Sequence, residues 1–156
     1  QNMAAAAVVC VEHYMRNPKK LTAQQLLNLQ RYLESITKRH VSTPQPIAPA
    51  ADKTGQYKGF EGGNKFNGRE LYYAACHTCH PNGNQGIAPA IPRDRDPSYY
   101  AKKVREGDGM GAVLSGVDPT AYDQNSGEFM PFFGADRLNT QQIRDIIAYI
   151  KSLPSP

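Results

Sequence analysis

Two cysteines and a histidine lie close together near the middle of the chain, in the run Cys76-His77-Thr78-Cys79-His80. On a helical turn, two thiols three positions apart can add across both vinyl groups of one porphyrin. The histidine after the second thiol then lies beneath the iron as an axial ligand. A zinc site would need a second pair of soft ligands, and the remaining cysteine is the isolated Cys10. The spacing therefore predicts one covalently attached haem c, held by Cys76 and Cys79, with His80 as the proximal iron ligand.

Two methionines are candidates for the opposite face of the iron. Met130 lies in Gly127-Glu-Phe-Met-Pro-Phe-Phe, where the proline stiffens the loop and the phenylalanines can keep water from the haem edge. Met110 lies in Gly-Asp-Gly-Met-Gly, which permits a close approach but supplies little rigidity. The sequence favours Met130 as the distal ligand over Met110, and the competing interpretation of each is a methionine that fills a core gap. Thioether sulfur favours ferrous iron and raises the reduction potential.

Three helices are expected to position these ligands. Residues 68–75 form a short helix that leads into the cysteine run, and residues 97–106 form a second helix that ends at a glycine. The stretch 107–130 reads as a long glycine-rich loop. A last helix starts at Asn139 and carries isoleucines on one face, at Ile143, Ile146, Ile147 and Ile150.

Residues 1–40 are expected to form a pair of helices. The segment Met3–Met15 is apolar nearly all round, which indicates a buried helix. The second helix begins at Thr22, with Gln25 as its partner in a capping box. An apolar stripe follows at helical spacing, made of Leu26, Leu29, Leu33 and Ile36.

The chain is expected to have three parts: residues 1–40, 41–64 and 65–156. The middle part is rich in proline and glycine, so it is predicted to be a linker or a strap across a surface. Residues 21–36 align without gaps to residues 138–153, with the same cap and apolar stripe. Either any capped amphipathic helix has this pattern, or the N-terminal part derives from a second haem domain that lost its haem-binding half.

The third part, residues 65–156, resembles the class I c-type cytochromes. The matching elements are Gly68-Arg-Glu-Leu-Tyr72, Cys76 to His80, Gly86-Ile-Ala-Pro89, Met130-Pro131, and Leu138 with the final helix that bears Tyr149. The resemblance implies an all-α fold, the cytochrome c fold, with helices and long loops around one haem. It does not extend to residues 1–60, which have no counterpart in the simple single-haem members.

The resemblance also implies particular contacts. The first and last helices of the family cross closely, and here Gly68, Tyr72 and Tyr149 occupy the crossing. A proline carbonyl accepts the second N–H of the ligand imidazole, and Pro89 occupies that place relative to His80. Haem c is attached outside the cytoplasm, so the resemblance implies the bacterial periplasm or an equivalent compartment. We accordingly interpret Gln1 as the start of an exported chain whose signal peptide is removed.

Several other polar side chains have more than one interpretation. His77, inside the attachment run, is expected to be exposed and to point away from the iron, and His13 and His40 to be surface residues. Cys10 is expected to be a buried, inert thiol, with pairing between chains or a relic of a distal ligand as alternatives. Four side chains could bind haem propionates or belong to a solvated loop and helix start: Arg93, Arg95, Tyr99 and Tyr100.

Composition bears on the partners. The 156 residues carry a formal charge of +4, a weak excess that two haem propionates would reduce. No Lys/Arg-rich run with interleaved aromatic residues is present, so nucleic acid is not an expected partner. No apolar stretch approaches the length of about 20 residues that spans a membrane.

These features predict a periplasmic single-electron carrier that exchanges electrons with redox partner proteins. The alternative is a haem subunit of a redox enzyme, acting on sulfur compounds or peroxide, which would need an open distal position. Residues 1–40 could form a homodimer or dock to another subunit, because their apolar first helix needs burial.

Overall fold

The computed structural model describes residues 7–8, 10–14, 19–36, 47–122 and 130–154. The chain divides into two compact units, residues 1–46 and 47–156. Within the described ranges every regular element is a helix and none is a strand, so the expected all-α fold is confirmed.

Helix α3 (Lys65–Ala75) and helix α6 (Thr140–Ser152) are each set by a side chain at the N-cap. The side chain of Asn64 accepts hydrogen bonds from the first backbone N–H groups of α3, so this helix begins three residues before the predicted start. Asn139 and Gln142 form a reciprocal capping box at α6, as its sequence pattern predicts.

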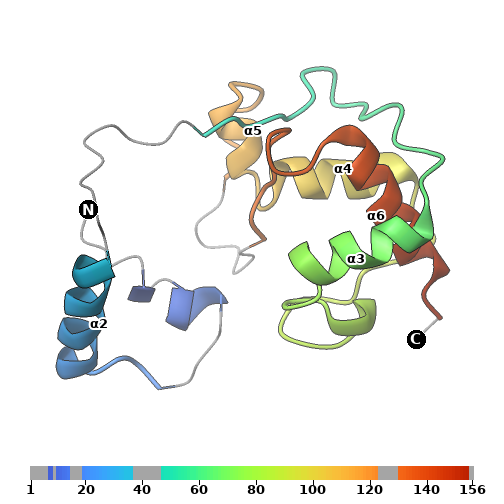
Figure 1. The fold of residues 1–156 in the computed structure, drawn as a ribbon. Coiled ribbons are helices and arrows are strands. Elements are labelled where there is room, and N and C mark those ends of the chain that lie inside the picture. The colour runs from blue at the N-terminus through green and yellow to red at the C-terminus, as the bar shows by residue number, and fades with distance from the viewer. Residues whose placement is uncertain (1–6, 9, 15–18, 37–46, 123–129, 155–156) are drawn as a thin grey trace. The chain divides into compact units, whose positions relative to one another are not determined.

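Gly68 allows α3 and α6 to approach each other closely (Figure 1). A Cβ atom at this position would overlap the carbonyl oxygen of Asp145 in α6. Beside this contact, the rings of Tyr72 and Tyr149 lie with their centroids 5.2 Å apart. The expected contact of Gly68, Tyr72 and Tyr149 between the first and last helices of the haem-binding part is therefore present.

The isoleucine face of α6 is buried together with one face of helix α4 (Pro97–Glu106). The predicted bounds of α4 are confirmed, and its end at Gly107 is marked by a backbone φ of 64°. The predicted long loop contains a five-residue helix, α5 (Met110–Leu114), that the sequence pattern does not predict. One helical turn shows too little periodicity to be distinguished from a glycine-rich loop.

Residues 47–64, which we call the strap, belong to the second unit and pack along it (Figure 1). Tyr57 and Phe60 are buried in the core with the residues of α4 and α6. The carbonyl of Gly59 accepts a hydrogen bond from Arg144 Nε at 2.6 Å, and the N–H of Asn64 donates to Asp145 Oδ1 at 2.8 Å. Residues 47–64 therefore form a strap across a surface of the second unit, while residues 41–46 of the predicted middle part lie outside the described residues.

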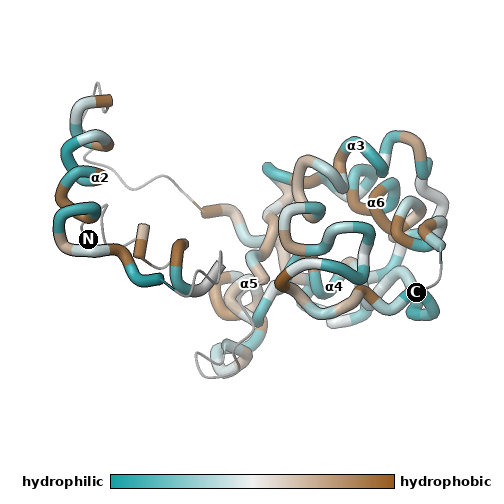
Figure 2. The backbone as a smooth tube through the Cα atoms, turned by 90° about the horizontal axis from the view of Figure 1, so that it is seen from below, coloured by the Kyte–Doolittle hydropathy of each residue, from teal (hydrophilic) through white to brown (hydrophobic). Residues whose placement is uncertain are grey.

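The first unit contains a short π-helix (Cys10–Tyr14) and helix α2 (Ala23–Ile36). The predicted capping box is present, because Thr22 N donates to Gln25 Oε1 at 2.9 Å and Gln25 N donates to Thr22 Oγ1 at 3.2 Å. Hydrophobic and hydrophilic residues alternate along α2 (Figure 2), but no residue in the described part of this unit is buried.

The expected burial of Cys10 is wrong, since its side chain is exposed. Its π-helix is only five residues long, and a helix that short offers little surface against which to bury a side chain. Much of the predicted helix Met3–Met15 lies outside the described residues, and so do the side chain of His13 and all of His40. Among the described residues, no helix combines the length and the apolar character needed to cross a membrane.

Candidate haem site

The cysteine run lies on a turn that continues α3. The N–H groups of Cys76 and His77 both donate to the carbonyl of Tyr72, at 2.8 and 2.9 Å. The N–H groups of Cys79 and His80 then donate to the carbonyl of Cys76, at 3.2 and 2.9 Å. These bonds hold the two cysteines about one helical turn apart, which is the geometry that the predicted attachment chemistry needs.

His80 is fixed at both its backbone and its side chain. Its carbonyl accepts a hydrogen bond from the hydroxyl of Tyr72, and its Nδ1 lies 3.1 Å from the carbonyl oxygen of Pro89. A carbonyl can only accept, so Nδ1 carries the proton and Nε2 keeps its lone pair. Burial also lowers the pKa of the His80 imidazole, against the opposing effect of the Pro89 hydrogen bond. A neutral imidazole with a free Nε2 is the form that binds iron.

A tight loop returns Pro89 to His80. Gly83 N donates to the carbonyl of His80 at 3.0 Å, and Ala88 N donates to the carbonyl of Cys79 at 3.2 Å. A Cβ atom at Gly86 would overlap the ring of Pro81, so the loop can close only with glycine there. The contact between His80 and Pro89 that the resemblance implied is present in the structure.

The thiol of Cys76 differs from that of a thiol–disulfide exchange protein. Burial, followed by the nearby Cys79, raises the pKa of the free Cys76 thiol to about 12. Exchange proteins lower the pKa of one cysteine so that a thiolate forms near neutral pH. The electrostatics of this site therefore favour a structural, covalent use of the pair over disulfide chemistry.

The expectation that His77 is exposed is wrong. Its ring stacks on Tyr73 with centroids 4.2 Å apart, and it is half-buried. The cause is the turn after α3, which places the two aromatic residues one above the other. Among the described residues, His77 Nδ1 has no hydrogen-bond partner.

Both candidate distal ligands are half-buried. Met110 is the first residue of α5, while Met130 follows the undescribed residues 123–129 and packs against the core. The half-buried apolar side chains on that core also include Cys76, Ile91 and Phe133. Apolar groups beside the attachment cysteine fit the faces of a porphyrin, so the residues present are compatible with haem c.

The four candidate propionate ligands make other contacts. The guanidinium of Arg93 donates to the carbonyls of Asn82 and Pro154, and the Tyr100 hydroxyl donates to the carbonyl of Pro92 at 2.7 Å. The guanidinium carbon of Arg95 lies 5.8 Å from the centre of the Tyr99 ring. Arg93 Nε is buried with no partner among the described residues, so one donor of this set remains unused.

Comparison with known proteins agrees with this site. Residues 66–154 match the family described as Cytochrome c. The chain is also similar to the "Cytochrome c-550-like protein" of Trichodesmium erythraeum (strain IMS101), with 24% identity over 123 residues, which cover 78% of this chain and 74% of the relative. The family match covers more than half of the chain and includes the whole cysteine run. The chain therefore belongs to the cytochrome c family and binds haem c covalently.

Proposed function

We propose that the protein carries single electrons between redox partner proteins in the periplasm. Cys76 and Cys79 would hold the haem through thioether bonds, and His80 and Met130 would hold its iron. The observation that carries this proposal is the restraint on His80, whose Nδ1 hydrogen is directed to the carbonyl of Pro89 at 3.1 Å. Haem c supplies the one-electron Fe(III)/Fe(II) couple when bound.

The residues of the chain orient the ligands. Pro89 keeps the His80 imidazole in one orientation and one tautomer, which also tunes the electron density at its other nitrogen. The hydroxyl of Tyr72 donates a hydrogen bond to the carbonyl of His80 and so fixes the backbone of His80. The sulfur of Met130 is a neutral ligand that raises the reduction potential. Because these contacts restrain residues that would hold the group, the site would need little rearrangement when a single electron is exchanged.

The first experiment measures the cofactor and its ligands. The full chain is purified from a bacterial periplasm that assembles haem c, and its mass and its ferric and ferrous spectra are recorded. We expect a covalent haem adduct, low-spin iron, and the weak far-red band of methionine bound to ferric iron. A redox titration should give one reversible one-electron step. A chain without covalent haem would refute the proposal, and high-spin ferric iron would favour the redox-enzyme alternative.

The second experiment locates the protein. Fractionation of the native cells, followed by detection of the haem-stained chain, should recover it with periplasmic marker proteins. Recovery with cytoplasmic markers would contradict the proposed location, and would leave the redox titration unaffected.

A further inference from the structure

The segment that contains Met130 is bonded to the last turn of α4. The carbonyl of Met130 accepts a hydrogen bond from Asp108 N at 3.1 Å, and Phe133 N donates to the carbonyl of Val104 at 2.8 Å. These two bonds lie on either side of Pro131 and Phe132. The helix end therefore holds the backbone from the Met130 carbonyl to Phe133, on the C-terminal side of the proposed distal ligand.

Gly107 makes this contact possible. It adopts a φ of 64°, which favours glycine. A Cβ atom there would overlap the carbonyl oxygen of Met130 and lie 2.9 Å from the backbone nitrogen of Phe132. A larger residue at position 107 would have to push the methionine segment away from α4.

Arg105 holds the far end of the same segment. Only 3% of its surface is exposed, and its NH1 group donates to the carbonyls of Phe133 and Leu138, at 2.8 and 2.7 Å. One buried guanidinium thus closes the loop that runs from the methionine segment to the N-terminal end of α6. These are charge-assisted hydrogen bonds, which are stronger than bonds between neutral groups.

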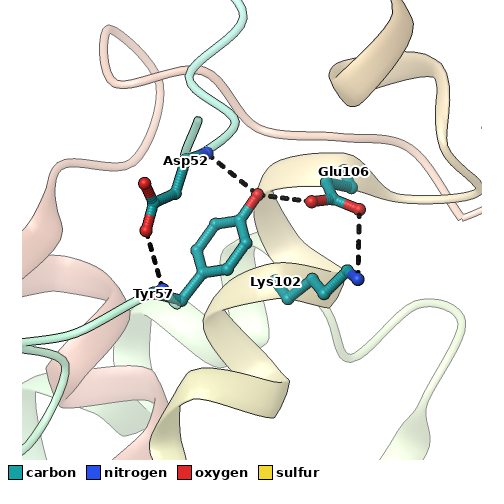
Figure 3. Close-up of polar contacts among 4 residues, drawn as sticks. All are labelled: Asp52, Tyr57, Lys102 and Glu106. Atoms are coloured by element: carbon teal, nitrogen blue, oxygen red, sulfur yellow. Dashed lines mark hydrogen bonds and ion pairs between the residues drawn. The ribbon is translucent and has the colours of Figure 1, made fainter. Parts of the chain in front are cut away.

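The strap also contacts the last turn of α4 (Figure 3). The hydroxyl of Tyr57, whose residue is 2% exposed, donates to Glu106 Oε1 at 2.6 Å and accepts from Asp52 N at 3.0 Å. Asp52 Oδ2 in turn accepts from Tyr57 N at 2.7 Å. Lys102 lies 4.0 Å from the other oxygen of Glu106 and is largely exposed, so this ion pair contributes little.

We infer that the C-terminal end of α4 together with the two residues after it, Arg105–Asp108, is a positioning site that presents Met130 to the iron, and that strap residue Tyr57 is part of it. Gly107 lets the methionine segment approach the end of α4, and Arg105 closes the loop from that segment to α6. The hydrogen bond between Tyr57 and Glu106 keeps the last turn of α4 in place. The inference rests on the proposed role of Met130 as distal ligand. Loosening any of these contacts should let the methionine leave the ferric iron more often.

The test is a competition between Met130 and added imidazole in the ferric holoprotein. Gly107→Ala is compared with Gly116→Ala. The two glycines have nearly the same φ, 64° and 67°, but a Cβ at Gly116 has no heavy atom within 4 Å. Both variants place a Cβ on a residue with a positive φ, and only the first places it against the methionine segment. We expect G107A to tighten imidazole binding by about tenfold or more and to weaken the far-red methionine band. G116A should match the unsubstituted protein.

A second, milder pair of variants keeps the inference testable if the G107A protein does not assemble. Glu106→Ala removes the acceptor of the Tyr57 hydroxyl, whereas Glu106→Gln keeps an acceptor oxygen. We expect E106A to tighten imidazole binding by about threefold to tenfold, and E106Q to remain near the unsubstituted value. A Tyr57→Phe variant should behave like E106A.

Met130→Leu separates the possible failures. If M130L keeps the methionine band, Met130 is not the ligand, and both the ligand assignment and this inference are overturned. If M130L loses the band but G107A and G116A bind imidazole alike, with E106A equal to E106Q, only the inference is overturned. The electron-carrier proposal is judged separately by the redox titration.

Discussion

Individual side chains in this protein work mainly by holding backbone groups at the haem site. Tyr72 donates a hydrogen bond to the carbonyl of His80, and Arg105 donates to the carbonyls of Phe133 and Leu138. The carbonyl of Pro89 accepts a hydrogen bond from the His80 imidazole N–H. These hydrogen bonds stabilise the loops and also orient the candidate ligands.

Arg105→Met should lower the free energy of unfolding by about 2 to 5 kcal/mol, because the half-buried Phe133 and the buried Leu138 lose the donor to their carbonyl groups. Arg69→Met is the matched control. Arg69 pairs with Glu70 at 2.8 Å, but both side chains are more than half exposed, so its loss should change stability by less than about 1 kcal/mol. Denaturant unfolding of both holoproteins measures the difference. Equal losses would show that the buried guanidinium is not needed.

Tyr72 should make the protein less stable at alkaline pH. Burial is the main cause that raises the pKa of Tyr72 from 10.0 to about 12. Between these values the unfolded chain has lost the proton and the folded chain keeps it, so stability falls as pH rises through this window. The free energy of unfolding, measured from about pH 9 to about pH 12, should decline less steeply in Tyr72→Phe than in the unsubstituted protein. Tyr32→Phe, at an exposed ring, should keep the original slope, and an unchanged slope in Y72F would contradict the prediction.

At the scale of the elements, one close helix contact organises the haem-binding unit. Helices α3 and α6 meet where Gly68 faces the carbonyl of Asp145, and α3 delivers the cysteine run directly at its end. The last turn of α4 then holds the methionine segment. The ends of α3 and α4 thus place the candidate ligands, and backbone hydrogen bonds hold the loops beside them.

Gly68→Ala tests the contact between α3 and α6. Alanine normally stabilises a helix interior by up to about 1 kcal/mol relative to glycine. Here its Cβ would overlap a backbone carbonyl that cannot rotate away, so we expect a loss of about 3 kcal/mol or more. Asn67→Ala, at an exposed position of the same helix, should be neutral or slightly stabilising. Thermal unfolding of the two holoproteins measures the difference in stability. A stabilised G68A would refute the close approach of α3 to α6.

On the scale of the whole molecule, the boundary between the two units lies at residues 46 and 47. The strap therefore belongs with the cytochrome unit, where Tyr57 and Phe60 are part of the core. Helix α2 has no buried residue, and its exposed side chains include Leu27, Tyr32 and Ile36. The first unit remains our candidate for association with a second copy or another subunit.

Two truncations test this boundary. Removal of residues 1–46 should leave covalent haem, the ligand spectrum and the reduction potential unchanged. Removal of residues 1–60 should destabilise the protein, because it deletes Tyr57 and Phe60 from the core.

Light scattering on the full chain and on the protein without residues 1–46 measures association. If residues 1–40 hold a homodimer together, the full chain should have twice the mass per particle expected for one copy. Unchanged association after the removal of residues 1–46 would exclude that role.

The sequence alone determined the cofactor chemistry and most of the helices. The cysteine run, the capping residues of α2 and α6 and the isoleucine face are signals carried within a few neighbouring residues, and their consequences are local. The same holds for the end of α4 at Gly107, whose positive φ is typical of a glycine after a helix.

Only the tertiary structure decided what surrounds these elements. The strap contacts, the buried Arg105 and the approach of Met130 to Gly107 join residues far apart in the chain, and no local pattern marks such pairs. Tyr57 and Glu106 are 49 positions apart, yet their side chains are joined by one 2.6 Å hydrogen bond. Short-range periodicity and capping record which segments become helices, whereas the pairing of distant segments depends on how the complete core packs.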